Sequence, residues 1–341
     1  MKKNRNINHG SISVLKLSMV LTILTLLLLL IALFSCAVGS AGYSVMEIMR
    51  ALFSSDESTV KIIILNLRLP RVILAVLIGA ALSVSGALLQ AVMRNPLADP
   101  GTIGVSAGAG TAAITILLIF PQLSLSLPMF AFVGAAFACV LIYLLAWKNG
   151  IDPTRIILSG VAINSVLGAY NSLLQLMNSD NLSGVLAFMN GSLTGVSWKD
   201  VEVMVIYTVI GLILSFFCIR QANALQLGDE MAKNLGIRVN LSRICLSAIS
   251  AFLAAASVSV VGMIGFVGLL VPHIARMLVG SDYKALIPTS ILLSGCILLL
   301  ADTIGRTLIP GLEIPVGIVM SVTGGPFFLY MLRKRGKFNA G

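Results

Sequence analysis

Long apolar runs dominate the pattern of hydrophobic and polar positions along this chain, and short polar segments separate them. Most runs are close to 20 residues long and do not alternate with a period of two, which favours membrane-spanning helices over barrel strands. The pattern predicts one all-α polytopic membrane domain over residues 1–341, with about ten transmembrane helices. The predicted helices cover residues 14–38, 72–93, 102–120, 128–147, 154–177, 201–219, 242–263, 265–280, 285–305 and 314–332.

The stretch from Ile244 to Ala275 contains 32 residues without a charge and is the hardest to divide. A single helix of that length would measure about 48 Å, whereas the hydrocarbon core of a bilayer is about 30 Å thick. Gly262 and Gly265 lie in its middle, and Pro272 follows them. We therefore expect a break near Gly262–Gly265, between a full span and a shorter one.

The composition excludes an ordinary soluble domain. Hydrophobic residues make up 58% of the chain and charged residues only 11%, and the mean hydropathy is +1.02. Soluble domains carry about 25% charged residues, so this surface suits lipid. The net charge of +10 does not indicate nucleic acid, because the basic residues stand at the ends of apolar runs and not on one soluble face.

The distribution of basic residues predicts the orientation, because cytoplasmic loops carry an excess of Lys and Arg. With ten spans and a cytoplasmic N-terminus, 17 Lys and Arg lie inside and six outside. With nine spans, the basic tail at residues 333–337 would lie outside, against this rule. We therefore expect ten spans with both termini cytoplasmic.

Two pairs of positions suggest an internal repeat. Arg71 stands at the start of the second predicted span and Arg243 at the start of the seventh, with Ser85 and Ser257 at the same offset. The two spans would run in opposite directions, as in transporters built from inverted repeats. The sequence therefore predicts an inverted repeat.

The N-terminal span admits a second interpretation as an export signal, because Leu33–Cys36 loosely resembles a lipoprotein cleavage box. A signal core is roughly 7–15 residues long. The run from Leu17 to Met46 has no charge and is far longer. We therefore interpret this segment as the first span.

The outer ends of the second and ninth spans carry charged residues. Arg68 and Arg71 flank Pro70, which favours a helix start at that point. They could snorkel at the interface or hold carboxylates of a partner bidentately. Asp302 and Arg306 are spaced i, i+4, so we expect them to pair on one helix face.

The segment from Gly86 to Gly101 joins the second and third spans on the predicted cytoplasmic side. Pro96 and Pro100 forbid a continuous helix here. Irregular backbone at membrane depth is tolerated only against protein or a water-filled cavity. The segment is therefore a candidate gate, with an ordinary tight loop as the alternative.

The largest predicted internal loop, residues 220–241, contains a short amphipathic helix between Leu225 and Gly236. Two acids favour its N-terminus and a glycine would end it. Its apolar residues recur at i, i+4 and i+8. It could lie on lipid or insert into a cytoplasmic partner. The residues that define it are Leu227, Gly228, Asp229, Glu230, Met231, Ala232, Leu235 and Gly236.

Catalytic and metal-binding motifs are missing. The five cysteines are scattered singly through apolar segments, without ligand spacing. There is no phosphate-binding G-x-x-x-x-G-K-[ST] loop, so the chain cannot bind ATP by that route. The sequence therefore predicts a protein that is not itself an enzyme and holds no metal.

Several of these segments, in this order, resemble the FecCD permease family, the membrane subunits of bacterial iron-siderophore and cobalamin ABC importers. The resemblance runs from about residue 60 to 333. It is carried by GAALSVSGALLQAVMRNPLADPGTIGVSAGAG, by GFVGLLVPHIARMLVG and by Glu313-Ile314-Pro315-Val316-Gly317-Ile318. Residue 314 is Ile where the family usually has Leu.

The resemblance implies a multi-pass protein of the bacterial cell membrane that works as a homodimer or with a related permease subunit. Two cytoplasmic ATPase subunits would bind below it, and an extracytoplasmic substrate-binding protein would dock outside. The chain itself would hold no cofactor, because ATP and Mg would be bound by the partner subunits. The lipid bilayer is the remaining partner.

Matching positions carry the family's roles onto individual residues. The binding protein would dock on Arg68, Arg71 and Arg306, and the ATPase would receive the helix at Gly228–Gly236. The gate would comprise Asn95, Pro96, Leu97, Pro153 and Thr154. At the second gate turn some relatives carry Ser and Thr, so Asp152 and Pro153 depart from the pattern.

The same residues bear on function and substrate. An importer driven by alternating access is favoured over a secondary transporter, whose coupling acid could only be Asp302, and over an intramembrane enzyme. Uncharged polar residues are expected to line the pathway, which suits a polar chelate. A ferric siderophore is expected, with cobalamin or haem as alternatives. The expected lining residues are Gln90, Asn164, Asn171 and Gln175.

Overall fold

The computed structural model describes residues 13–38, 59–148, 150, 152–179 and 182–336. Within these ranges the chain is helical, and one isolated bridge joins Ile309 to Leu312. The elements are α1 (Val14–Ala37), α3 (Thr59–Ile63), η1 (Ile64–Arg68), α4 (Leu69–Met93), η2 (Pro100–Ile103), α5 (Val105–Ile119), η3 (Pro121–Ser126), α6 (Leu127–Ala146), α7 (Pro153–Met177), α8 (Ser183–Asn190), α9 (Trp198–Phe217), α10 (Ile219–Gln226), α11 (Asp229–Asn234), α12 (Val239–Val261), α13 (Val267–Val279), α14 (Tyr283–Thr307) and α15 (Val316–Gly336). The all-α prediction is confirmed.

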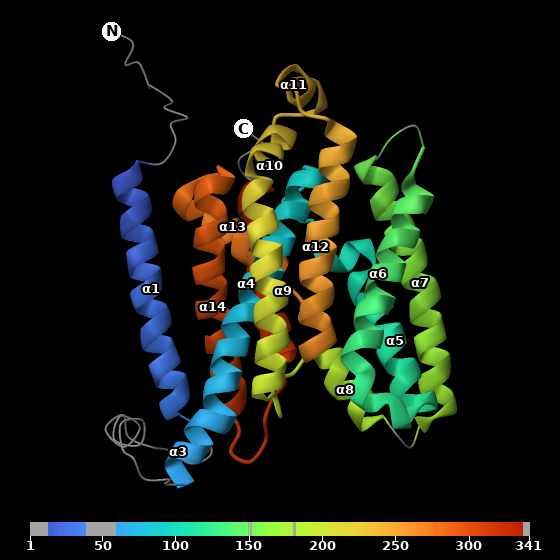
Figure 1. Cartoon of the computed structure of the whole chain (residues 1–341), viewed down its shortest axis with the longest axis vertical. Helices are drawn as coiled ribbons and strands as arrows, with labels where there is room; N and C mark the ends of the chain where they lie inside the picture. The colour runs from blue at the N-terminus through green and yellow to red at the C-terminus, as the bar shows by residue number, and fades with distance from the viewer. Residues whose placement is uncertain (1–12, 39–58, 149, 151, 180–181, 337–341) are drawn as a thin grey trace.

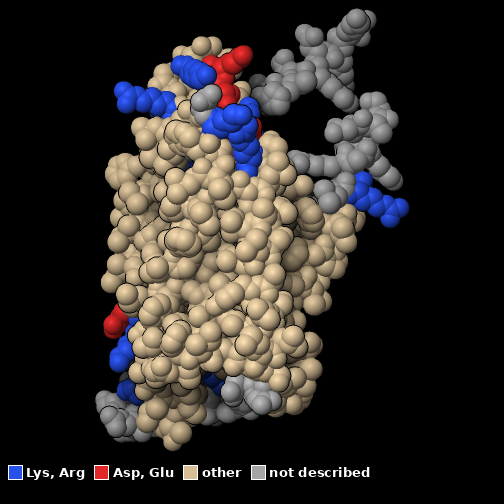
Figure 2. All heavy atoms as spheres, turned by 90° about the vertical axis from the view of Figure 1, so that its right-hand side faces the viewer, with Lys and Arg blue, Asp and Glu red and all other residues tan. Residues whose placement is uncertain are grey.

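Seven helices in the described part of the chain are long and apolar enough to cross a membrane, and three shorter apolar helices accompany them. The shorter ones are α5, α13 and the part of α15 from Val316 to Tyr330. They fall below the length of about 20 residues that a full crossing takes. Figure 2 shows a broad band without Lys, Arg, Asp or Glu between two charged ends, as a bilayer requires.

The second span begins earlier than predicted. Helical backbone runs without interruption from Thr59 to Met93, and residues 64–68 form a π-helical turn just before Pro70. Proline lacks an N–H and clashes with the preceding turn of a regular helix, and a π turn is wide enough to relieve this. Pro70 therefore lies in the first turn of α4, as predicted, but a π-helical turn precedes it.

The expected break near Gly262–Gly265 is confirmed. α12 ends at Val261 and α13 begins at Val267. Gly262 has a φ of +75°, and a Cβ on it would lie 2.2 Å from the carbonyl oxygen of Phe188. Only glycine fits there, because both the backbone conformation and the close approach exclude a side chain.

α4 is the central helix of the bundle. Of its most apolar window, 83% is buried, and it packs against α9, α12, α13 and α14. α4 and α12 run in opposite directions (Figure 1), and the hydroxyls of Ser85 and Ser250 join them at 2.9 Å. Ser257 instead donates to Leu253 within α12. The two serines of the expected repeat therefore make different bonds.

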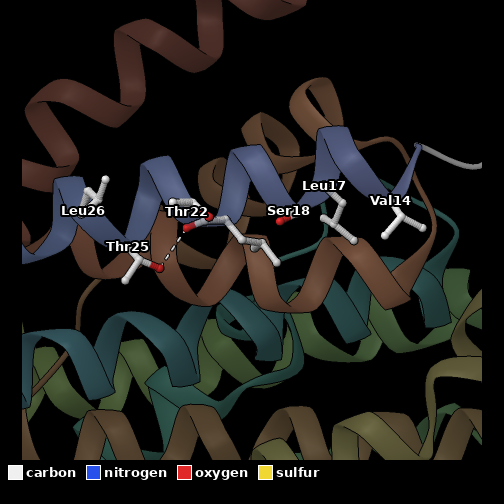
Figure 3. A pocket seen from close by; sticks show the side chains of 7 residues that line it. Val14, Leu17, Ser18, Thr22, Thr25 and Leu26 are labelled. Atoms are coloured by element: carbon white, nitrogen blue, oxygen red, sulfur yellow. Dashed lines mark hydrogen bonds between the residues drawn. The ribbon is translucent and has the colours of Figure 1, made fainter.

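α1 and α7 lie at opposite edges of the bundle (Figure 1) and are equally exposed, with 11% of each apolar window buried. They differ in hydropathy, which is 2.9 for α1 and 1.4 for α7. The groove along α1 is lined by side chains of that helix alone, and the Thr25 hydroxyl donates within it to the Leu21 carbonyl (Figure 3). α1 is therefore suited to lipid, and its groove is no substrate site.

Candidate functional site at the two ends of the bundle

The end of the bundle opposite α11 contains a cluster of ion pairs around Asp302, on α14. Arg71, on α4, donates from Nη2 to Oδ1 of Asp302 at 2.9 Å and from Nε to both carboxylate oxygens at 3.1 Å. Arg306 places its Nε 3.1 Å from Oδ2, which confirms the expected i, i+4 pair. The Asp302 side chain is only 2% exposed. A charge this deeply buried needs partners, and two arginines supply them.

Glu313 adds a second carboxylate from the segment before α15. Its Oε2 accepts from Nη1 of Arg71 at 2.9 Å and from Oγ1 of Thr194 at 2.7 Å. Burial alone would raise the pKa of Glu313, but the hydrogen bonds from Arg71 and Thr194 and the charges of Arg71 and Arg306 lower that pKa overall. The glutamate is therefore ionised at neutral pH. Thr194 is a partner that sequence reasoning missed.

Arg68 and Arg306 also close the end of α1. Arg68 donates to the carbonyls of Cys36 and Ala37, and Arg306 donates to the carbonyl and hydroxyl of Ser35. The last carbonyls of a helix lack partners within it and carry partial negative charge, so two guanidinium groups stabilise this terminus. The helix continues through Cys36, at the position that resembled a cleavage box.

The structure brings the three predicted docking arginines together. Arg68, Arg71 and Arg306 line one cavity of about 660 Å³ with Glu313 and the turn at residues 310–312. Their side chains are largely buried, because each is engaged by groups of this chain. The three guanidinium groups therefore already have partners within this chain. We name Arg68, Arg71, Asp302, Arg306 and Glu313 the Asp302 cluster.

The α11 end contains a second cluster around one aspartate. Asp229, at the start of α11, accepts from Nη2 of Arg243 at 2.9 and 3.1 Å. Nη1 of Arg94 lies 3.9 Å from the same carboxylate. Arg243 is 4% exposed, Asp229 35% and Arg94 43%. We name Arg94, Asp229 and Arg243 the Asp229 cluster; the sequence did not indicate that these residues meet.

The predicted helix between Leu225 and Gly236 is divided in the structure: α10 ends at Gln226, and the shorter α11 (Asp229–Asn234) follows after a break at Leu227–Gly228 and projects from the bundle (Figure 1). Leu227, Met231 and Leu235 are 60, 54 and 50% exposed, and Ala232 is fully buried against the bundle. α11 ends at Asn234, and Gly236, with a φ of +77°, follows its C-cap. The tip of the bundle therefore presents exposed apolar side chains with exposed Glu230 beside them.

The candidate gate lies next to the Asp229 cluster. α4 ends at Arg94 in the left-handed conformation, and the Asn95 side chain then accepts from the Leu97 backbone N–H at 2.9 Å. Pro96 and Leu97 follow in a turn, and Leu97 is 37% exposed. Burial raises the pKa of Asp99, despite the lowering effect of the Gly101 backbone N–H. The expected interruption of helix between Gly86 and Gly101 is therefore confirmed after Met93.

The second predicted gate turn is a helix start. Asp152 is the N-cap of α7 and accepts from the Thr154 backbone N–H at 2.8 Å. Pro153 occupies the first helical position, where its missing N–H costs nothing. The departures from the family pattern at Asp152 and Pro153 thus form a regular helix N-terminus.

The expected pathway residues occupy different surroundings. Gln90 is 3% exposed, donates to the Gly268 carbonyl at 3.1 Å and accepts from Arg276. It therefore joins α4 to α13 inside the core of the single chain. Asn164 donates to the Gly101 carbonyl, while Gln175 bonds back to Asn171 within α7. The described part of the chain has no group of residues that could hold a metal ion.

Apolar helices around a packed core, with ion clusters confined to the two ends, define a polytopic α-helical membrane protein. A profile of the FecCD transport family matches residues 25–334, and the chain belongs to that family.

Its relatives cover nearly the whole chain. The chain is 40% identical to the Fe(3+)-citrate import system permease protein YfmE of Bacillus subtilis (strain 168), over 97% of this chain and 98% of that protein. It is also 40% identical to the cobalamin import system permease protein BtuC of Halobacterium salinarum, over 81% of this chain and 75% of that protein. A solved metal-chelate type ABC transporter in an inward-facing conformation superimposes with a TM-score of 0.82 at 29% identity, over 93% of this chain and 99% of that one.

Proposed function

We propose that this chain is the permease subunit of an ATP-binding-cassette importer in the bacterial inner membrane, and that its cargo is a ferric chelate. Family membership over residues 25–334 supports the class. The exposed apolar tip at α11 is the observation on which the proposal rests, because a pore subunit driven from outside itself needs a surface that receives the driving subunit.

The α11 end is cytoplasmic in this proposal, and the Asp302 cluster faces outward. The start of α1 and α11 lie at the same end of the bundle (Figure 1), which fits the excess of basic residues assigned to that side. Ten crossings with both termini inside follow. A cysteine at Gly336 should resist a membrane-impermeant reagent that labels one at exposed Lys199; equal labelling would contradict this topology.

The ATPase subunits would bind α11 through Leu227, Met231 and Leu235. ATP and Mg would be bound and hydrolysed there, and the permease would contribute neither catalytic residue nor cofactor. Ala232 anchors α11 on the bundle, and Asp229 ties it to α12 and to the end of α4. Movement of α11 would therefore reach the gate turn at Asn95–Leu97 directly, and this supports alternating access.

A second copy, or a related permease subunit, would cover α7. This helix is mostly exposed and the least apolar of the seven long spans. Lipid would disfavour its polar side chains, whereas a pathway shared between two subunits would hydrate them. Asn164, Asn171 and Gln175 remain our candidates for lining that pathway, and uncharged amides suit a polar chelate.

An extracytoplasmic binding protein would dock over the cavity of the Asp302 cluster. The cluster has three arginines and two carboxylates, so it would attract acidic side chains of a partner. Asp302 is less suited to the rival role of ion-coupling acid in a secondary transporter, because two arginines hold its carboxylate.

Reconstitution tests the proposal. The permease, with ATPase subunits and binding protein from its own cell, is placed in liposomes and supplied with labelled ferric citrate, a ferric hydroxamate, haem or cobalamin. We expect ATP-dependent uptake of a ferric chelate. Uptake of cobalamin or haem alone would overturn the cargo, and uptake driven by an ion gradient without ATP would overturn the importer class.

A further inference from the structure

The two carboxylates on Arg71 are held very differently. Asp302 takes the Nε and Nη2 of the guanidinium and is 2% exposed, whereas Glu313 takes Nη1 and is 48% exposed. Glu313 also lines the cavity of the Asp302 cluster. One edge of the guanidinium is therefore fixed within the bundle, and the other is covered by a carboxylate that solvent can reach.

The bonds of Glu313 converge on one atom. Its Oε2 accepts from Arg71 at 2.9 Å and from Thr194 at 2.7 Å. A single rotation of the Glu313 side chain would break both bonds together. The glutamate thus joins α4 to the segment between α8 and α9, and it does so through one movable oxygen.

The segment that carries Thr194 is tied to α12 and α15, and α8, which precedes it, is tied to the connection between α12 and α13. The backbone N–H of Ser192 donates to the Val261 carbonyl at 2.8 Å, at the end of α12, and the N–H of Gly317, in α15, donates to the Gly191 carbonyl at 3.2 Å. The N–H of Met263 donates to the Phe188 carbonyl, in α8, at 2.9 Å. Release of Thr194 would therefore loosen a junction of α8, α12 and α15 near the outer end of α7.

We propose that Glu313 is an exchangeable carboxylate, which an acidic side chain of the docking protein replaces on Arg71, and that its departure releases Thr194 and the α8 junction. This inference rests on the docking role proposed above. An incoming carboxylate can accept from Nη1 in place of Glu313 while Asp302 keeps Nε and Nη2, so the exchange leaves Arg71 paired throughout. Docking would then change the contacts of α8 while buried Asp302 stays in place.

A purely structural role for Glu313 makes the opposite prediction. An ion pair with one half-exposed partner adds little to stability, and its loss should leave docking unchanged or weaken it. An exchangeable carboxylate competes with the partner, so its removal should strengthen docking. The sign of the change in affinity separates the two roles.

The experiment measures how tightly the substrate-binding protein binds the permease–ATPase complex in nanodiscs. The binding protein used is the one that supports uptake in the reconstitution. Glu313→Gln should lower the Kd about two- to fivefold, because the competing charge is gone. Glu202→Gln, a matched change at an exposed acid at the start of α9, should leave the Kd unchanged. An unchanged or higher Kd for Glu313→Gln would overturn the exchange.

A pair of variants at the cavity rim tests docking separately. Leu312 is 56% exposed and lines the cavity without a side-chain role in the ion pairs. Leu312→Glu should raise the Kd about tenfold at low salt by repelling an acidic partner, whereas Leu312→Gln should not. If both bind equally well, the docking site itself is wrong; if only the Glu313 result fails, docking stands without exchange.

The α8 junction gives a second measurement that needs no partner. A nitroxide at Leu186→Cys, an exposed position in α8, is read in a background with Cys245→Ser, which removes the exposed native cysteine. Thr194→Val and Glu313→Gln should both increase the mobility of the label, and Glu202→Gln should not. Equal mobility in all variants would overturn the link from Glu313 to α8.

Discussion

The two ends of this bundle use the same arrangement, one aspartate shared by two arginines, in different surroundings. Asp302 is 2% exposed between Arg71 and Arg306, and Asp229 is 35% exposed between Arg243 and Arg94. Removing one charge of a buried pair leaves its partner buried without compensation. At a surface, water screens the charges and can take the place of a lost partner. The Asp302 cluster therefore holds α4, α14 and the end of α1 in one arrangement. The Asp229 cluster, at the base of α11, can exchange its ion pairs for contacts with water.

The largest expected effect is that of Asp302→Asn. It leaves Arg71 and Arg306 buried with less negative charge, and breaking a buried pair in this way costs about 3–5 kcal/mol. We expect a large fall in the thermal midpoint of the purified protein in detergent. Glu313→Gln is the control in the same cluster and should cost less than about 1 kcal/mol. Similar losses for the two variants would show that burial does not distinguish them.

Met231→Asp should have the next largest effect, on assembly and not on folding. The side chain is 54% exposed in the single chain, so the change leaves the bundle intact, but a charge would have to be buried against the ATPase. We expect the ATPase subunits to bind at least about tenfold more weakly in a pull-down from nanodiscs. Lys233→Gln, on the same helix outside the apolar stripe, serves as the control. Full substrate-stimulated ATP hydrolysis in Met231→Asp would contradict the coupling role and indicate that α11 lies on the lipid surface.

Asp229→Asn should have an intermediate effect. Arg243 is 4% exposed and loses a charged acceptor, which costs about 1–2 kcal/mol when discounted for the exposure of Asp229. We expect ATPase binding to survive and transport per ATP hydrolysed to fall, because α11 is no longer fastened to α12. Lys233→Gln, on the same helix, is again the control. Loss of ATPase binding in Asp229→Asn alone would instead make Asp229 a contact for the partner.

Arg94→Gln should have the smallest effect on stability. Its ion pair spans 3.9 Å with both side chains substantially exposed, and such pairs contribute about 0–1 kcal/mol. The thermal midpoint should barely move. A fall in transport without a fall in stability would indicate that Arg94 carries movement from α11 to the gate turn, and a large loss of stability would contradict the contrast between the two clusters.

Reversing the charges of Arg68 and Arg71 would be a poor test of docking. Arg68 closes the end of α1 and Arg71 holds Asp302, so reversal would damage the fold before it reached a partner. The sequence indicated correctly that these arginines gather with Arg306. It gave no sign that Asp302 holds Arg71 or that the end of α1 holds Arg68 and Arg306, because those contacts join residues far apart in the chain.

Local patterns predicted much of the architecture. The length of the apolar runs placed the helices, the glycines after Val261 placed the break between α12 and α13, and the i, i+4 spacing paired Asp302 with Arg306. Each of these depends on neighbours within one or two helical turns. Pro70 likewise lies in the first turn of α4, although the helical turns that precede it were not predicted.

The sequence by itself determined that the chain is an apolar helical bundle with its charges at the ends of spans, because hydropathy and charge act position by position along the chain. Only the tertiary structure decided which charges meet and how deeply they lie. It enclosed Gln90 in the core, set Asp229 between Arg94 and Arg243 and joined Glu313 to Thr194 across more than a hundred residues. Burial and partners decide what a charge does, and both arise from the packing of helices that the sequence alone does not place side by side.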